Sequence, residues 1–153
     1  MTTIWDALSE DERGRLFGGC PTRSFAGGDV LLTEGETGSS MLLLTEGEVT
    51  VTRGETELAR LGPGHALGEM ALLDPAPRSA TVTARTAGAL VELDRAELWG
   101  LLADGDPGAV KVLQALTATV CTRLADVNGL VRDEVTRPRG NVFSRLWKSV
   151  WRK

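Results

Sequence analysis

With 153 residues, 42% of them hydrophobic and 25% charged, the chain suits one soluble globular domain, and no apolar stretch is long enough to span a membrane. The net charge of −4 is uneven, because residues 1–135 hold all 21 acidic residues and only 11 of the 17 basic ones. This predicts a domain over 1–135 that binds nucleic acid poorly, followed by a basic tail over 136–153.

The chain is expected to begin with short helices and to continue as β-structure. Ser9 and Glu12 have the spacing of a capping box at the start of a helix. Between residues 24 and 94, short runs rich in Val, Leu and Thr alternate with glycines, which is typical of many short strands joined by tight turns. Residues 49–53 and 57–61 flank a glycine turn as an expected hairpin.

Two helices are predicted after the strands. Asp94 and Glu97 have the spacing of a second capping box, which opens a short helix through residue 102. Asp106 is followed by proline, a pair typical of an N-cap and the first helical position. No further proline occurs before Pro138, so we expect one long helix to about Glu134.

Residues 67–82 have the parts of an anion-binding cradle. Gly68 permits a close backbone approach, and the residues after it can form a helical turn whose free N–H groups favour a phosphate. Arg78 offers a planar fork of donors for two phosphate oxygens, Ser79 adds a hydroxyl donor, and Glu69 can accept a hydrogen bond from a ribose 2′-hydroxyl. The residues alone leave a second interpretation open, in which Arg78 and Glu69 form a surface ion pair.

This segment resembles the phosphate-binding cassette of the cyclic-nucleotide-binding domains, the family of the catabolite activator protein and the protein kinase A regulatory subunits. The elements of that cassette are present in order as Gly68-Glu69, Ala71-Leu72 and Arg78-Ser79-Ala80. An earlier signature of the family is present as Gly35, Gly38, the aliphatic run 41–44 and Gly47. The resemblance covers roughly residues 8–134. It departs from the family at Leu32, where a smaller or β-branched residue is usual and where we expect only a packing adjustment.

The resemblance implies a mainly β fold with flanking helices, a β-roll (double-stranded β-helix or jelly roll) followed by a long C-terminal helix. It implies that Arg78 binds the cyclic phosphate together with the backbone N–H groups of Ala71 and Ser79. Glu69 would then accept from the ribose 2′-hydroxyl, and Gly68 would let the ribose approach. The implied ligand is a 3′,5′-cyclic nucleotide, cyclic AMP in preference to cyclic GMP, although Ser79 does not distinguish the two.

In this family the base is usually capped by the long helix, where Asn128 is a candidate to contact a base edge and Val127 and Val131 are its apolar neighbours. A merely solvated asparagine is the alternative. The expected ligand-binding residues are Gly68, Glu69, Ala71, Arg78, Ser79, Ala80 and Asn128.

The sequence gives no indication of catalysis. No Ser/His/Asp or Cys/His arrangement, metal-ligand cluster or nucleotide-hydrolysing loop is visible, and His65 lies in a turn where a solvated ring is expected. Cys20 and Cys121 match no metal spacing, and the amino terminus has no signal pattern. We therefore expect a non-enzymatic cytoplasmic protein with reduced thiols, no metal and no cofactor besides its ligand.

The long helix predicts a homodimer through residues 110–131. Its apolar residues fall on a and d positions over three heptads: Val110, Leu113, Val120, Leu124, Val127 and Val131, with Thr117 in the same row. The alternative is that this stripe packs only on its own β-roll. Only 18 residues follow Val135, too few for the DNA-binding domain of an activator, so we do not expect a transcription factor.

The basic tail is expected to form an amphipathic helix over residues 141–153, with Asn141 as its N-cap. Its apolar stripe consists of Phe143, Leu146, Trp147, Val150 and Trp151. The stripe has three interpretations: it folds back on the acidic domain, docks in the groove of a protein partner, or lies on an anionic membrane surface. The last would make the protein peripheral at a membrane.

Two functions of different class follow. In the first, the protein is a sensor whose long helix and tail are reordered by the cyclic nucleotide and so act on a partner. In the second, it is an adaptor with a vestigial pocket that docks through its tail. The intact pair Glu69 and Arg78 favours the sensor. The partner, and whether the ligand activates or inhibits, are not encoded in a recognisable pattern.

Overall fold

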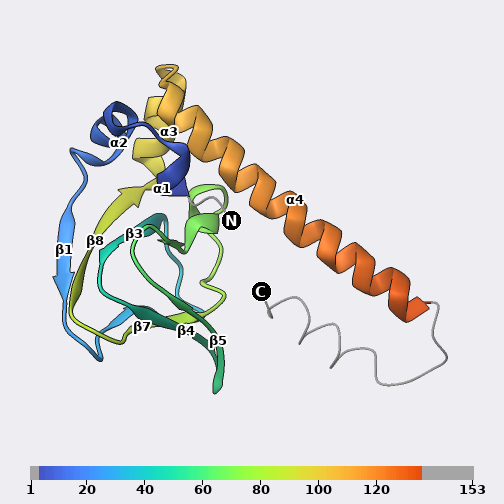
Figure 1. Ribbon diagram of the computed structural model, residues 1–153. Helices are drawn as coiled ribbons and strands as arrows, with labels where there is room; N and C mark the ends of the chain where they lie inside the picture. Colours follow the sequence, from blue (N-terminus) through green and yellow to red (C-terminus); the bar gives the residue numbers. More distant parts are fainter. Residues whose placement is uncertain (1–3, 136–153) are drawn as a thin grey trace. The chain divides into compact units, whose positions relative to one another are not determined.

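The computed structural model describes residues 4–135 (Figure 1). The chain divides into two units, residues 1–114 and 115–153, with the division inside the long helix α4. The elements are α1 (Ile4–Ala7), α2 (Glu10–Phe17), β1 (Thr22–Phe25), β2 (Val30–Leu32), β3 (Ser40–Glu46), β4 (Val49–Arg53), β5 (Thr56–Leu61), β6 (Ala66–Leu67), the 3₁₀ turn η1 (Glu69–Leu72), β7 (Thr81–Ala84), β8 (Gly88–Asp94), α3 (Arg95–Ala103) and α4 (Pro107–Val135). The predicted boundary after residue 135 and the tail 136–153 lie outside the described residues, and none of the helices within 4–135 is long and apolar enough to cross a membrane.

The strands form two four-stranded antiparallel sheets, in the orders β1-β8-β3-β6 and β2-β7-β4-β5. Strands from opposite ends of the β region therefore pair, as Thr22 does with Val91. The turn between β3 and β4, where the chain passes from one sheet to the other, requires a glycine. Gly47 has a φ of +85°, and a Cβ on it would lie 2.6 Å from the carbonyl oxygen of Ala87. The predicted β-roll with flanking helices is confirmed, and the hairpin around Gly54 has the predicted strands to within one residue.

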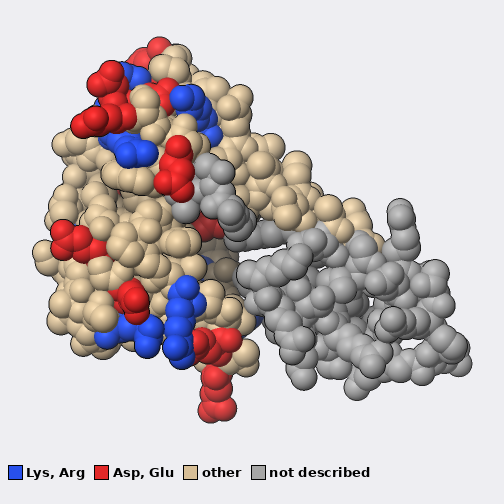
Figure 2. Space-filling view, in the orientation of Figure 1, with Lys and Arg blue, Asp and Glu red and all other residues tan. Residues whose placement is uncertain are grey.

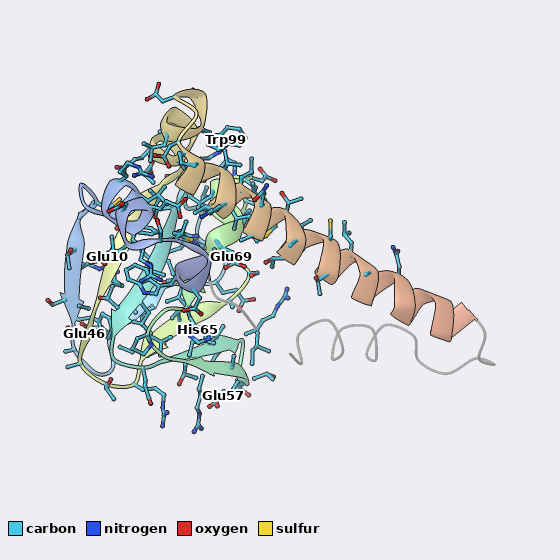
Figure 3. The ribbon with its side chains drawn as sticks, turned by 45° about the horizontal axis from the view of Figure 1, so that its top comes forward. Glu10, Glu46, Glu57, His65, Glu69 and Trp99 are labelled. Atoms are coloured by element: carbon cyan, nitrogen blue, oxygen red, sulfur yellow. The ribbon has the colours of Figure 1, made fainter. Side chains whose placement is uncertain are left out.

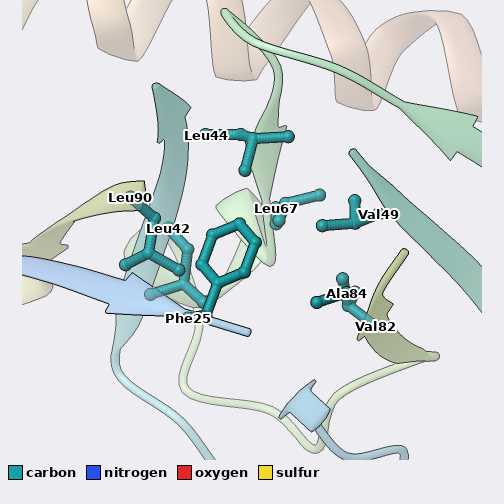
Figure 4. Packing of buried hydrophobic residues seen from close by; sticks show 8 residues of the cluster. All are labelled: Phe25, Leu42, Leu44, Val49, Leu67, Val82, Ala84 and Leu90. Carbon is teal, nitrogen blue, oxygen red and sulfur yellow. The ribbon is translucent and has the colours of Figure 1, made fainter. Parts of the chain in front are cut away.

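The core lies between the two sheets (Figure 4). It consists of Phe25, Leu42, Leu44, Val49, Leu67, Val82, Ala84 and Leu90. Met41 and Leu43 lie on the opposite face of β3, the face on which their partner strand β8 carries Leu93. Helices α2 and α3 both contact β8. A strand covered on both faces needs apolar residues at successive positions, which explains the uninterrupted aliphatic run 41–44.

The predicted helix starts are confirmed with one correction. At α2, Ser9 and Glu12 form both hydrogen bonds of a capping box, and at α4 the Asp106 carboxylate accepts from the N–H groups of Gly108 and Ala109. At α3, Asp94 accepts from the N–H of Ala96, but the Glu97 side chain does not act as predicted. Its carboxylate instead accepts a hydrogen bond from the buried thiol of Cys20 at 3.4 Å.

Two ion pairs join α2 to the first turns of α4. Lys111 Nζ lies 2.8 Å from Glu12 Oε2, and Arg15 Nε lies 2.9 Å from Asp106 Oδ2. The hydrogen bond from Lys111 holds the pKa of Glu12 below its ordinary value of 4.5, and the N–H of Ala109 is the main reason that the pKa of Asp106 is lowered from 3.8. On the face shown in Figure 2, acidic and basic side chains likewise stand next to one another.

We predict that replacing Glu12 by glutamine lowers the melting temperature at neutral pH and has no effect in strong acid. A carboxyl whose pKa is depressed by folding stabilises the fold above its unfolded pKa. That stability is lost as the pH falls through the folded pKa. The difference in melting temperature between wild type and Glu12→Gln, followed by circular dichroism, should therefore begin to shrink as the pH falls through the ordinary glutamate pKa of about 4.3, and should vanish only at lower pH, where the carboxyl is protonated in the folded protein as well.

Glu55→Gln, in the exposed turn of the β4–β5 hairpin, is the matched control and should melt like the wild type throughout. Equal melting of Glu12→Gln and wild type at pH 7 would show that the ion pair does not stabilise the fold.

Candidate functional site

Arg78 lies in the loop between η1 and β7, and its backbone is fixed by the loop between β2 and β3. The Arg78 N–H donates to the carbonyl of Glu36, and the Gly35 N–H donates to the carbonyl of Arg78, both at 2.8 Å. Thr37 and Pro77 form a β-bridge beside them. The two segments that carry the sequence resemblance, 35–38 and 78–80, are therefore neighbours in space.

The guanidinium of Arg78 is held by backbone carbonyls between two glycines. Nη1 donates to the carbonyl of Gly68 at 2.9 Å, and Nη2 donates to the carbonyl of Ser40 at 2.7 Å. A Cβ on Gly38 would overlap Nη2, and a Cβ on Gly68 would overlap Nη1 and lie 3.1 Å from Leu32 Cδ1. Gly38 does not have a positive φ, so space for the guanidinium is what requires a glycine there.

The charge of Arg78 is partly desolvated. Burial lowers the pKa of its guanidinium, and the negative charges of Glu92 and then Glu69 act in the opposite direction. A half-buried cation whose desolvation outweighs its nearby negative charge is stabilised by an anion that makes hydrogen bonds to it. The electrostatics of the site therefore favour an anionic ligand.

The structure brings most of the predicted site residues together. Gly68 has the left-handed backbone (φ +67°) that opens the η1 turn, on which Glu69 is half-buried (Figure 3) and Ala71 is buried. The N–H of Ala71 donates to the carbonyl of Gly68 at 3.1 Å. Ser79, which is exposed, and Ala80, which is half-buried, follow Arg78 directly in the chain.

Asn128 is the exception among the predicted residues. It lies on α4 in the second unit and its side chain is exposed. Its contact with a base therefore stays a prediction. Leu32 packs against the core cluster between the sheets, and the packing adjustment expected there stays a prediction.

Sequence reasoning missed two residues behind Arg78. Ser40 supplies the carbonyl for Nη2, and its hydroxyl donates to Glu92 Oε1 at 2.5 Å. Arg78 and Glu92 line one cavity of about 130 Å³, together with Arg23 and Ser40. The alternation of β8 carried a signal for this, because Glu92 stands two residues after the core residue Leu90.

The other reactive groups do not form a site with Arg78. Burial is the main cause that raises the pKa of the Cys20 thiol to about 12, which keeps it protonated and unreactive. His65 was expected to be solvated, but it is half-buried and its Nδ1 lies 2.9 Å from the carbonyl oxygen of Gly62 (Figure 3). Within residues 4–135, no three His, Cys, Asp or Glu side chains are grouped so that they could hold a metal ion.

Comparison with known proteins gives relatives that match about half of the chain. The chain is 40% identical over 81 residues to a cAMP-dependent protein kinase regulatory subunit of Hypocrea atroviridis, covering 53% of this chain and 18% of that protein. It is 31% identical over 83 residues to a cGMP-dependent protein kinase of Plasmodium berghei (strain Anka), covering 54% of this chain and 10% of that protein. The chain thus spans less than a quarter of the length of these relatives.

Among solved structures, the catabolite activator protein of Thermus thermophilus superposes with a TM-score of 0.70 and 28% sequence identity, covering 85% of this chain and 62% of that one. The family model for the cyclic nucleotide-binding domain matches residues 22–104, more than half of the chain. These residues contain both sheets, the η1 turn and Arg78. The chain belongs to the cyclic nucleotide-binding domain family.

Proposed function

We propose that the chain is a non-catalytic regulatory sensor that binds a 3′,5′-cyclic nucleotide, cyclic AMP in preference to cyclic GMP, with Arg78 on the phosphate. The observation that carries the proposal is the half-buried Arg78 guanidinium, held by two backbone carbonyls between Gly38 and Gly68. A guanidinium has five N–H donors, so donors remain for two phosphate oxygens after these two bonds.

In this proposal the residues around Arg78 contact different parts of the ligand. Ser79 assists at the phosphate, with Ala80 beside it, and the N–H of Ala71 exchanges its bond to the Gly68 carbonyl for one to the phosphate. Glu69 accepts from the ribose 2′-hydroxyl, and Gly68 leaves room for the sugar. Asn128 contacts the base. The preference for cyclic AMP is supported by the higher identity to the regulatory subunit, which by its name is cAMP-dependent, than to the cGMP-dependent kinase.

We further propose that the signal leaves the domain through α4 and the basic tail 136–153, in a cytoplasmic homodimer. The support for a dimer is the exposure of the predicted apolar stripe, in which the side chains of Val110 and Leu124 are 40% and 58% exposed. Large apolar side chains on a helix surface favour a partner that covers them. The adaptor with a vestigial pocket remains the competing function, and ligand binding distinguishes the two.

Replacing Arg78 by alanine should weaken cyclic nucleotide binding by at least roughly tenfold and leave the fold intact, because the phosphate loses its charged donor. The measurement is titration calorimetry with cyclic AMP, cyclic GMP and a cyclic dinucleotide, alongside the melting temperature without ligand. Arg85→Ala, which removes an exposed arginine paired with Glu48, is the matched control and should bind normally. A wild-type protein that shows neither binding nor a thermal shift at millimolar ligand would favour the adaptor instead.

Replacing Gly38 by alanine should also weaken binding, by roughly tenfold, while the protein stays folded. The new Cβ overlaps only the end of a flexible side chain, so the guanidinium moves and the backbone does not need to. Gly62→Ala is the control, because a Cβ there meets no atom within 4 Å. Normal affinity of Gly38→Ala would show that the position of the guanidinium seen here is not the binding position.

A glutamate in place of Val120 or Leu124 should shift the protein from dimer to monomer, because a charge would be buried in the seam. Light scattering at tens of micromolar protein gives the mass. Thr122→Glu, on an exposed position outside the stripe, should leave the mass unchanged. Wild-type protein that runs as a monomer under these conditions would rule out the proposed dimer.

A further inference from the structure

Glu92 is a carboxylate at a position that faces the inside of the roll. In the ladder between β3 and β8, Leu90 pairs with Leu44 and Glu92 pairs with Leu42. Directly opposed residues of an antiparallel pair lie on the same face of the sheet, and the three leucines of these two pairs belong to the core between the sheets. Glu92 therefore occupies a core-facing position at the end of the apolar row.

Ser40 connects Glu92 to the binding site. Its hydroxyl donates to Glu92 Oε1 at 2.5 Å, and its carbonyl accepts from Arg78 Nη2 at 2.7 Å. Glu92 and Arg78 line the same cavity of about 130 Å³, which Arg23 and Glu36 also line. The nearby negative charge that most favours the charged form of the Arg78 guanidinium is that of Glu92, ahead of Glu69.

A carboxylate in this position costs desolvation energy, and a half-buried guanidinium costs desolvation energy too. Each charge reduces the desolvation cost of the other, so in the ligand-free protein the loss of either one leaves its partner uncompensated. A cyclic phosphate then brings a second negative charge to the same guanidinium. Glu92 repels it, because the two like charges both lie near the same guanidinium.

We propose that Glu92 is an internal counter-charge for Arg78 that stabilises the ligand-free protein and lowers the affinity of the site for the cyclic phosphate. This inference deepens the proposed function and rests on it for the affinity. Glu92 acts through Arg78, so it is a positioning residue and does not itself contact the ligand.

The test is Glu92→Gln, which removes the negative charge and keeps an oxygen that can accept from the Ser40 hydroxyl. Its affinity for cyclic AMP, measured by calorimetry, should rise by about three- to tenfold. Glu92→Asp, which keeps the charge, should stay close to wild type. Glu46→Gln, on an exposed position of the neighbouring strand β3, makes the same change in net charge and should also bind like wild type.

A second measurement does not need the ligand. In the ligand-free protein, Glu92→Gln should lower the melting temperature while Arg78 is present, and should leave it unchanged or raise it in an Arg78→Met background. This cycle distinguishes loss of a charge partner from a general packing defect, which would lower the melting temperature in both backgrounds.

The outcomes separate the inference from the proposed function. A wild-type protein that binds no cyclic nucleotide overturns the proposed function. The melting temperatures of Glu92→Gln in the two backgrounds then show only whether Arg78 and Glu92 stabilise each other. A wild type that binds while Glu92→Gln binds equally or more weakly overturns the inference and leaves the proposed function intact. The inference is overturned as well if Glu92→Gln lowers the melting temperature equally in the wild-type and Arg78→Met backgrounds.

Discussion

The site depends on one constraint: the guanidinium of Arg78 must sit half-buried between Gly38 and Gly68 while two backbone carbonyls hold it. Those carbonyls belong to residues 40 and 68, which are far apart in the chain and meet only because β3 pairs with β6 in one sheet. The Arg78 backbone is bonded to the loop that precedes β3. Residues from distant parts of the chain therefore contact the Arg78 side chain. The two glycine signatures of the sequence each supply a glycine, Gly38 and Gly68, that leaves space for its guanidinium.

Individual bonds join α3 to the η1 turn, and others join the helical segments of the first unit to one another. The indole N–H of Trp99 on α3 donates to the carbonyl of Leu72 at the end of η1, at 2.9 Å (Figure 3). Glu97, on the same helix, accepts from the Cys20 thiol, and α2 is paired with the first turns of α4 through Lys111 and Asp106. The turn that carries Glu69 is therefore linked to α3 by a directional bond, which a shift of that turn would strain or break.

Patterns within a few residues were sufficient to predict the elements and one half of the site. Caps such as Ser9 and Asp106 depend on local chemistry, and Arg78 was recognisable because its cassette is contiguous in sequence. Ser40 and Glu92 were missed because their role arises from pairing between β3 and β8, which no local pattern specifies. The error at Glu97 has the same origin, since its partner Cys20 is 77 residues away. For Glu92 the sequence did contain one indication, because a charged residue stands there at an inward-facing position of the strand, two residues after the core residue Leu90.

Under the proposed function, the two carboxylates near Arg78, Glu69 and Glu92, have different net effects on the affinity for the ligand. Both favour the charged guanidinium, and both repel a phosphate. Glu69, on the turn that opens at Gly68, can recover that cost from a ribose hydroxyl, so its charge is compatible with the complex. Glu92 already accepts from Ser40 inside the roll and gains nothing comparable from the ligand. Its charge therefore stabilises the protein without ligand relative to the complex, which is the property a sensor needs in order to release its ligand when the concentration falls.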